Sequence, residues 1–135
     1  MKSLIFALCL TWFSAAAWAA EPMAPKPDIG YYTFKEDFVT NVETLNPRDK
    51  LHFIRVKISL MLGDENDEPI IVELEPLLKD SIINILGAKE FSTIASTEGR
   101  ETIRGECHDK ISEIMQDKVG RQVVSDVLFL SYIYQ

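Results

Sequence analysis

The chain has few of the side chains from which catalytic and metal sites are built. Its 135 residues include two cysteines, Cys9 and Cys107, and two histidines, His52 and His108. Basic residues are also scarce, since 14 lysines and arginines stand against 21 acidic residues. This negative charge disfavours nucleic acid and anionic lipid as partners, because both repel an acidic surface. Proteins are therefore the expected partners.

Long apolar runs are missing after residue 20, so no later segment predicts a membrane span. The first 20 residues predict an export signal. Lys2 precedes an apolar run over residues 4–13, and Ala17-Trp18-Ala19 has the small residues that a signal peptidase reads. An uncleaved anchor is the alternative, because the uncharged segment is near the lower limit of a spanning length. The mature chain would then meet the membrane only through partners or an unremoved leader.

Removal of residues 1–20 would leave about 115 residues, enough for one domain with one hydrophobic core. Cys107 would be the remaining cysteine, so no disulfide could close within the exported chain. Residues 21–28 contain Pro22, Pro25 and Pro27, a density that favours an extended tether. We therefore expect a single folded domain over residues 29–135.

Two segments near the start of this domain have the composition of β-strands. Residues 31–42 are rich in aromatic and β-branched side chains, with an interruption expected around residues 35–37. Asn46 and Pro47 then favour a turn. Over residues 52–62 aliphatic side chains alternate with other types, which predicts a strand with one row facing a core. That row consists of Ile54, Val56, Ile58, Leu60 and Leu62.

Helical periodicity replaces this alternation in the middle of the chain. Apolar residues between Leu74 and Leu86 recur at three- and four-residue spacing, and Gly87 is a candidate C-terminal cap. The start of this helix stays open. Pro76 can occupy its first turn, or it can lie inside a longer helix that begins near Pro69.

A second helix is predicted from an N-cap at Ser96 to about Val119, just before Gly120. One narrow side of this helix is apolar, whereas charged residues cover the rest. A helix that lies on a sheet has this pattern. Its apolar side consists of Ile103, Cys107, Ile111, Ile114 and Met115.

The final segment, residues 123–134, returns to strand composition with apolar residues on both faces. The order strand, strand, helix, helix, strand predicts an α+β fold, in which an antiparallel sheet carries two helices packed on one face. One apolar row of the last strand would then stay on the uncovered face. The alternative is that the N-terminal strand or the proline-rich segment folds over that row.

We predict that the uncovered row forms a protein interface together with neighbouring residues of the strand over residues 52–62. Strict alternation places every second residue of the last strand, from Leu128 onward, in this row. The candidate interface consists of Leu128, Leu130, Tyr132, Tyr134, Phe53 and Arg55.

The sequence shows no pattern typical of a catalytic or metal site. Cys107 falls on the apolar side of its helix, where a free cysteine behaves as a small buried hydrophobe, and His108 points about 100° away from it. His52, at a strand end, favours a structural role. The acidic residues from 64 to 75 have the spacing of a calcium loop, but Pro69 stands where that loop needs glycine. We therefore expect no enzyme activity, no cofactor and no bound metal.

Four stretches of the chain resemble the flagellar basal-body-associated FliL family in sequence, order and spacing. They cover residues 31–43, 52–62, 77–106 and 124–135. The first stretch contains Thr40-Asn41-Val42, the third contains Glu98-Gly99-Arg100 at the start of a predicted helix, and the last ends in Gln135.

The resemblance implies a stomatin-like periplasmic domain at the flagellar basal body. It implies a non-enzymatic scaffold that supports the stator and motility, with stator proteins and further copies of itself as partners. Usual members keep a membrane helix, whereas the short leader here implies a soluble form or, if it is retained, an inner-membrane tether. A periplasmic module that binds a small ligand or a metal is the alternative function.

Overall fold

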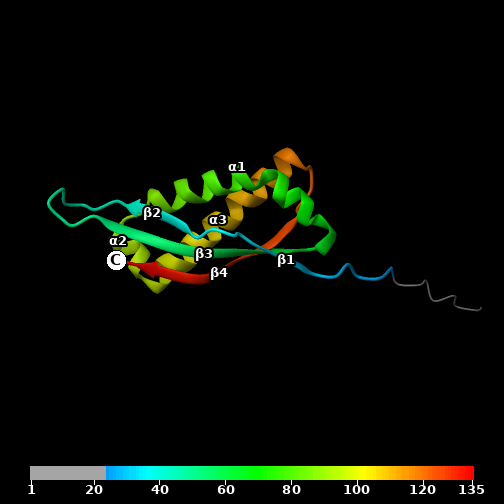
Figure 1. Ribbon diagram of the computed structural model, residues 1–135, viewed down its shortest axis with the longest axis horizontal. Coiled ribbons are helices and arrows are strands. Elements are labelled where there is room, and N and C mark those ends of the chain that lie inside the picture. Colours follow the sequence, from blue (N-terminus) through cyan, green and yellow to red (C-terminus); the bar gives the residue numbers. More distant parts are fainter. Residues whose placement is uncertain (1–23) are drawn as a thin grey trace, which may run out of the picture.

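The computed structural model describes residues 24–135, so the predicted export signal over residues 1–20 lies outside the described residues. The described chain has the predicted α+β class, with an antiparallel sheet and helices packed against it (Figure 1). A single 3-10 turn, Glu65–Asp67, precedes the first helix. In chain order the elements are β1 (Gly30–Thr33), β2 (Phe38–Val42), β3 (His52–Leu62), α1 (Glu68–Gly87), α2 (Phe91–Ala95), α3 (Thr97–Lys118) and β4 (Val124–Tyr134).

β3 is the central strand of the sheet. β1 and β2 pair with the two halves of one of its edges, and β4 pairs along the other edge, all antiparallel. The predicted interruption around residues 35–37 is confirmed, because it separates β1 from β2. The predicted turn between β2 and β3 is also present. It closes with a 2.9 Å hydrogen bond from the Asp49 amide to the Asn46 carbonyl.

The hydrophobic core lies between the sheet and the helices α1 and α3, which lie side by side (Figure 1). The predicted inward row of β3 is confirmed. Each of its aliphatic side chains is at most 1% exposed, and the burial of each contributes about 2 kcal/mol. The apolar side of α3 is confirmed as well. Its buried residues include Ile103, Cys107, Ile111, Ile114 and Met115.

The longer of the two predicted forms of α1 is the observed one. The helix begins at Glu68, with Pro69 in its first turn, and continues through Pro76 to Gly87. Pro76 is tolerated because it lies on the exposed side, where water can bond the carbonyl oxygen that proline leaves without a donor. Gly87 is the last residue of the helix, and the cap predicted there is instead Ala88, whose amide donates a hydrogen bond to the Asn84 carbonyl.

The corner between α2 and α3 is closely packed. The Ser96 hydroxyl caps α3 as predicted, accepting a 2.9 Å hydrogen bond from the Gly99 amide. The short helix α2 was not predicted, because five residues are too few to show a helical period. A Cβ atom on Gly99 would lie 1.8 Å from the Thr93 carbonyl oxygen, so the close approach of α2 to α3 requires glycine there.

The predicted alternation of β4 is wrong in its second half. Phe129 pairs with Ile58 and Ser131 pairs with Lys57, which leaves Leu130 as an extra residue in a β-bulge. One extra residue sends every later side chain to the opposite face. Tyr132 and Tyr134 therefore face the helices and do not share a face with Leu128.

The start of α1 is tied to the segment that follows α3. Arg121 donates two hydrogen bonds to the Asp67 carboxylate, at 2.9 and 2.6 Å. These bonds hold the pKa of Asp67 below its ordinary value of 3.8, and the partial burial of the carboxyl opposes them. A carboxyl whose folded pKa is lowered contributes stability above its unfolded pKa, and loses that contribution as the pH falls through the folded pKa.

Asp67→Asn should therefore lower the urea midpoint of unfolding at neutral pH, because the paired carboxylate is lost. The difference from the parent chain should shrink steadily as the pH falls below 3.8, the ordinary pKa of aspartate. Urea unfolding across a pH series measures both effects. A difference that stays constant down to strongly acidic pH would show that the ion pair is not its source.

Gly99→Ala should reduce the free energy of unfolding by about 3 kcal/mol, because the added methyl group forces α2 away from α3. Gly105→Ala is the matched control on the same helix, since its Cβ would meet nothing within 4 Å. The control should be neutral or stabilising by up to about 1 kcal/mol. Equal effects of the two substitutions in denaturant unfolding would contradict the packing described for the corner.

Candidate protein interface

The candidate interface is the side of the sheet that points away from the helices, which we name the open face. It is formed by the side chains that β3 directs away from the core and by their cross-strand neighbours. Among residues 24–135, no helix lies across this side (Figure 1). Its apolar members are Tyr31, Val39, Phe53, Met61, Leu128 and Ile133.

Several of these apolar side chains are unusually exposed. Tyr31 is 60% exposed, Val39 54% and Ile133 47%, whereas the others are half-buried. Val39 and Ile133 both pair with Arg55, one from each side of the central strand. An apolar cluster of this kind on a sheet is typical of a surface that contacts another protein.

Charged groups divide the open face. Arg55 and Lys57 both lie beside Asp37, with nitrogen–oxygen distances of 2.7 and 3.8 Å. These ion pairs are exposed to water and add little to stability. Around Arg55, two cations with one anion leave a small local positive excess, which favours partners that present a carboxylate there.

The six residues predicted for the interface are divided by the bulge in β4. Phe53, Arg55 and Leu128 lie on the open face. Leu130 lies at the bulge itself and is 56% exposed. Tyr132 and Tyr134 face the helices. The open face also includes Tyr31, Val39 and Ile133, which the alternation of the sequence did not group with the predicted residues.

Tyr132 and Tyr134 hold α2 against the sheet. The Tyr132 hydroxyl donates a 2.8 Å hydrogen bond to the Ile94 carbonyl, and the Tyr134 hydroxyl donates one of 3.3 Å to the Ala95 carbonyl. The Arg100 guanidinium lies 5.2 Å from the centre of the Tyr132 ring. Burial raises the pKa of Tyr132 to about 12, so it stays a hydrogen-bond donor throughout the physiological pH range.

Each histidine and the cysteine of the described chain has its own structural contacts. His52 stacks on Phe91 with 3.8 Å between the ring centres, and the His108 Nε2 atom lies 3.2 Å from the Ser125 carbonyl oxygen. Cys107 is fully buried, and burial raises the pKa of its thiol to about 12. Over residues 24–135, no cluster of three or more histidine, cysteine, aspartate or glutamate side chains has the arrangement of a metal site.

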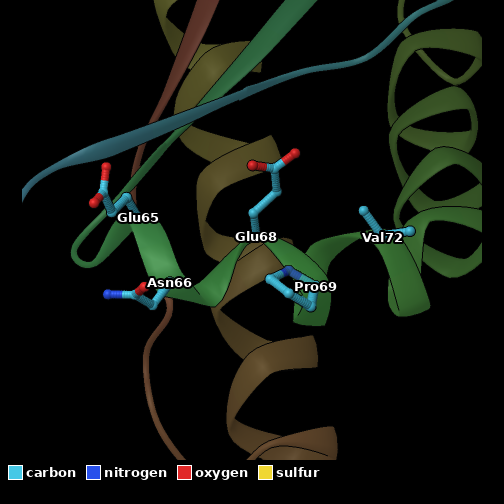
Figure 2. Close-up of a pocket in the computed structure, with 5 residues that line it drawn as sticks. All are labelled: Glu65, Asn66, Glu68, Pro69 and Val72. Atoms are coloured by element: carbon cyan, nitrogen blue, oxygen red, sulfur yellow. The ribbon is translucent and has the colours of Figure 1, made fainter.

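An open hollow lies at the start of α1, with a volume of about 520 Å³. Its lining residues are Glu65, Asn66, Glu68, Pro69 and Val72 (Figure 2). The carboxylates of Glu65 and Glu68 extend to the same side of the chain, and Glu68 lies between Glu65 and Val72. The calcium-like spacing is not used as a loop here, because Asp64 caps the 3-10 turn by accepting a 2.9 Å hydrogen bond from the Asn66 amide.

Two adjacent substitutions distinguish the faces of β4. Tyr132→Asp should lower the free energy of unfolding by about 2 kcal/mol or more, because it removes a bond to α2 and places a charge beside the core. Ile133→Asp should leave the stability of the monomer within about 0.5 kcal/mol, because its side chain is on the open face. Thermal unfolding of both variants checks the assignment, and the reverse order of effects would mean that Ile133 packs on the core and Tyr132 lies on the open face.

Among the helices of residues 24–135, none is both long and apolar enough to cross a membrane. A family model described as flagellar basal body-associated protein FliL matches residues 31–135, which takes in β2, β3, β4 and every described helix. The flagellar protein FliL of Aquifex aeolicus is 27% identical to the chain over 103 residues. That alignment covers 76% of the chain and 62% of the relative, so the chain spans about three fifths of the relative's length. The chain belongs to the FliL family of flagellar basal-body-associated proteins.

Proposed function

We propose that this protein is a non-enzymatic scaffold of the flagellar motor that works in the periplasm. It supports the stator through protein contacts and by assembling with copies of itself. The observation that carries the proposal is the open face, an exposed apolar surface on a domain of the FliL family.

The way the chain uses its ionisable groups supports a scaffold. Glu75 of α1 accepts a hydrogen bond from Tyr32, which joins β1 to α1. Glu75 also pairs with Lys79 of the same helix at 2.7 Å. Arg104 of α3 pairs with Asp126 of β4 at 2.7 Å. These groups connect helices to strands, so their hydrogen bonds and ion pairs stabilise the fold. A rigid domain with one exposed apolar face suits a protein whose task is contact.

The open face also has the features of a specific contact surface. Its exposed apolar side chains supply area to bury, and the ion pairs of Asp37 with Arg55 and Lys57 supply a charge pattern that fixes the orientation of a partner. The surface is placed on strands, so its side chains are held rigidly and little ordering is needed on binding.

Motility tests this function in the source organism. Deletion of the gene should reduce swimming, and the parent gene should restore it. A gene carrying Val39→Asp and Ile133→Asp should restore less than half of the lost swimming, because charges on the open face oppose burial of the contact. The matched control is Leu77→Asp, an apolar-to-acid change at a 37% exposed position of α1, which should restore swimming fully.

Co-purification of stator proteins with the tagged chain provides the second measurement, at equal protein levels in each strain. The Val39→Asp, Ile133→Asp protein should lose stator proteins that the Leu77→Asp protein keeps. Normal swimming of the deletion strain, in the absence of a second copy of the gene, would contradict the proposed function. Bound metal or a small molecule in native mass spectrometry of the pure protein would favour the ligand-binding alternative.

A further inference from the structure

The two ends of the long axis of the molecule carry surfaces of opposite character. The loop that joins β2 to β3 projects at one end, and the start of α1 lies at the other (Figure 1). We name residues 44–51 the hairpin tip, and the hollow lined by Glu65, Asn66, Glu68, Pro69 and Val72 the acidic hollow.

The hairpin tip combines exposed leucines with unpaired cations. Leu45 is 81% exposed and Leu51 is 83% exposed, more than any other large apolar side chain described between residues 24 and 135. Arg48 and Lys50 are exposed and make no ion pair within that part of the chain. Asp49, the acidic residue between them, belongs to a recess at the base of the hairpin that His52 also lines.

The hairpin tip is held in shape by its own hydrogen bonds. The Asn46 side chain accepts a 3.1 Å bond from the Arg48 amide, in addition to the bond that closes the turn. At the base, Glu43 exchanges backbone hydrogen bonds with Lys89 and Phe91, at 3.1 and 3.2 Å. A projecting segment that is already ordered loses little conformational freedom when it binds.

The acidic hollow offers the complementary chemistry. Glu65 and Glu68 make no ion pair with residues 24–135, and they line the hollow together with Pro69 and Val72. Val72 is 52% exposed. The hollow is wide open to solvent and has a volume of about 520 Å³, so it offers a shallow surface against which a leucine side chain can pack.

We propose that the hairpin tip of one copy docks in the acidic hollow of a second copy. A leucine of the tip covers Val72 and Pro69, while Arg48 and Lys50 lie opposite Glu65 and Glu68. This inference rests on the self-assembly part of the proposed function and assigns the surfaces that perform it. The two surfaces differ, so the contact runs head to tail and generates a ring if the rotation closes, or a filament if it does not.

Charge favours a second copy as the occupant. The chain carries a net charge of −7, so copies repel one another in most orientations. The docking of the hairpin tip in the acidic hollow brings exposed cations to exposed carboxylates, and it leaves the open face free for other partners. An exposed contact of this type weakens as the salt concentration rises.

A charge-reversal pair tests the proposal on the full purified protein by sedimentation velocity. R48E/K50E makes the hairpin tip acidic, and E65K/E68K makes the acidic hollow basic. Each variant alone should associate at least about tenfold more weakly than the parent, because like charges then meet. An equimolar mixture should recover the association of the parent, because the tip of each variant now matches the hollow of the other.

Matched controls place the same charge changes on the solvent side of α3. K110E/K118E and E113K/D117K should associate as the parent does. Leu45→Ser with Leu51→Ser keeps every charge and should weaken association by removing the apolar contact. Circular dichroism should show that all variants are folded, since the altered side chains are exposed in the monomer.

Two results would overturn the proposal. The first is a parent protein that stays monomeric at about 100 µM in low salt, and the second is a mixture of the two charge-reversal variants that does not recover association. If the acidic hollow instead binds a basic segment of another protein, the purified chain stays monomeric, which is the first result. A monomeric parent would also remove self-assembly from the proposed function, whereas a mixture that does not recover would overturn the assigned surfaces alone. The stator role is judged separately, by swimming of the deletion strain and by stator co-purification.

Discussion

The burial of one aliphatic row of β3 is the constraint on which the rest of the structure depends. Ile54, Val56 and Ile58 are fully buried under α1 and α3, and the row continues through Leu60 and Leu62. Because side chains alternate along a strand, this burial sends the intervening residues to the other side of the sheet. The helices lie together on one side (Figure 1). The open face is thus a consequence of how the core is formed, and its apolar side chains are available for another protein to bury.

Polar groups reinforce this core by joining its layers. Arg121 binds Asp67 at the start of α1, and Tyr132 bonds to the backbone of α2. Gly99 allows α2 to approach α3, which explains in physical terms why the Glu98-Gly99-Arg100 motif has glycine at its centre. The same motif places Arg100 over the Tyr132 ring. Features that identify the family by sequence therefore have structural roles at the corner between α2, α3 and β4.

Sequence reasoning predicted most of the fold, because strong periodicity and local caps determine those elements. β3, the break between β1 and β2, the Ser96 cap and the apolar side of α3 are confirmed, and the resemblance to the FliL family is confirmed by the family match. The bulge at Leu130 was missed because an inserted residue leaves composition unchanged while reversing the faces after it. The candidate interface was therefore only partly assembled, with Tyr132 placed on the wrong face. The interface role of the open face and the stator as a partner stay proposals.

Site-specific photo-crosslinking in swimming cells can show whether the open face contacts another protein. A photoreactive amino acid at position 133 lies on the open face, whereas one at position 77 lies on the exposed side of α1. Position 133 should form crosslinks to another motor protein or to a second copy, and position 77 should form few. Crosslinks from position 77 with none from position 133 would contradict the claim that the uncovered side of the sheet is the contact surface.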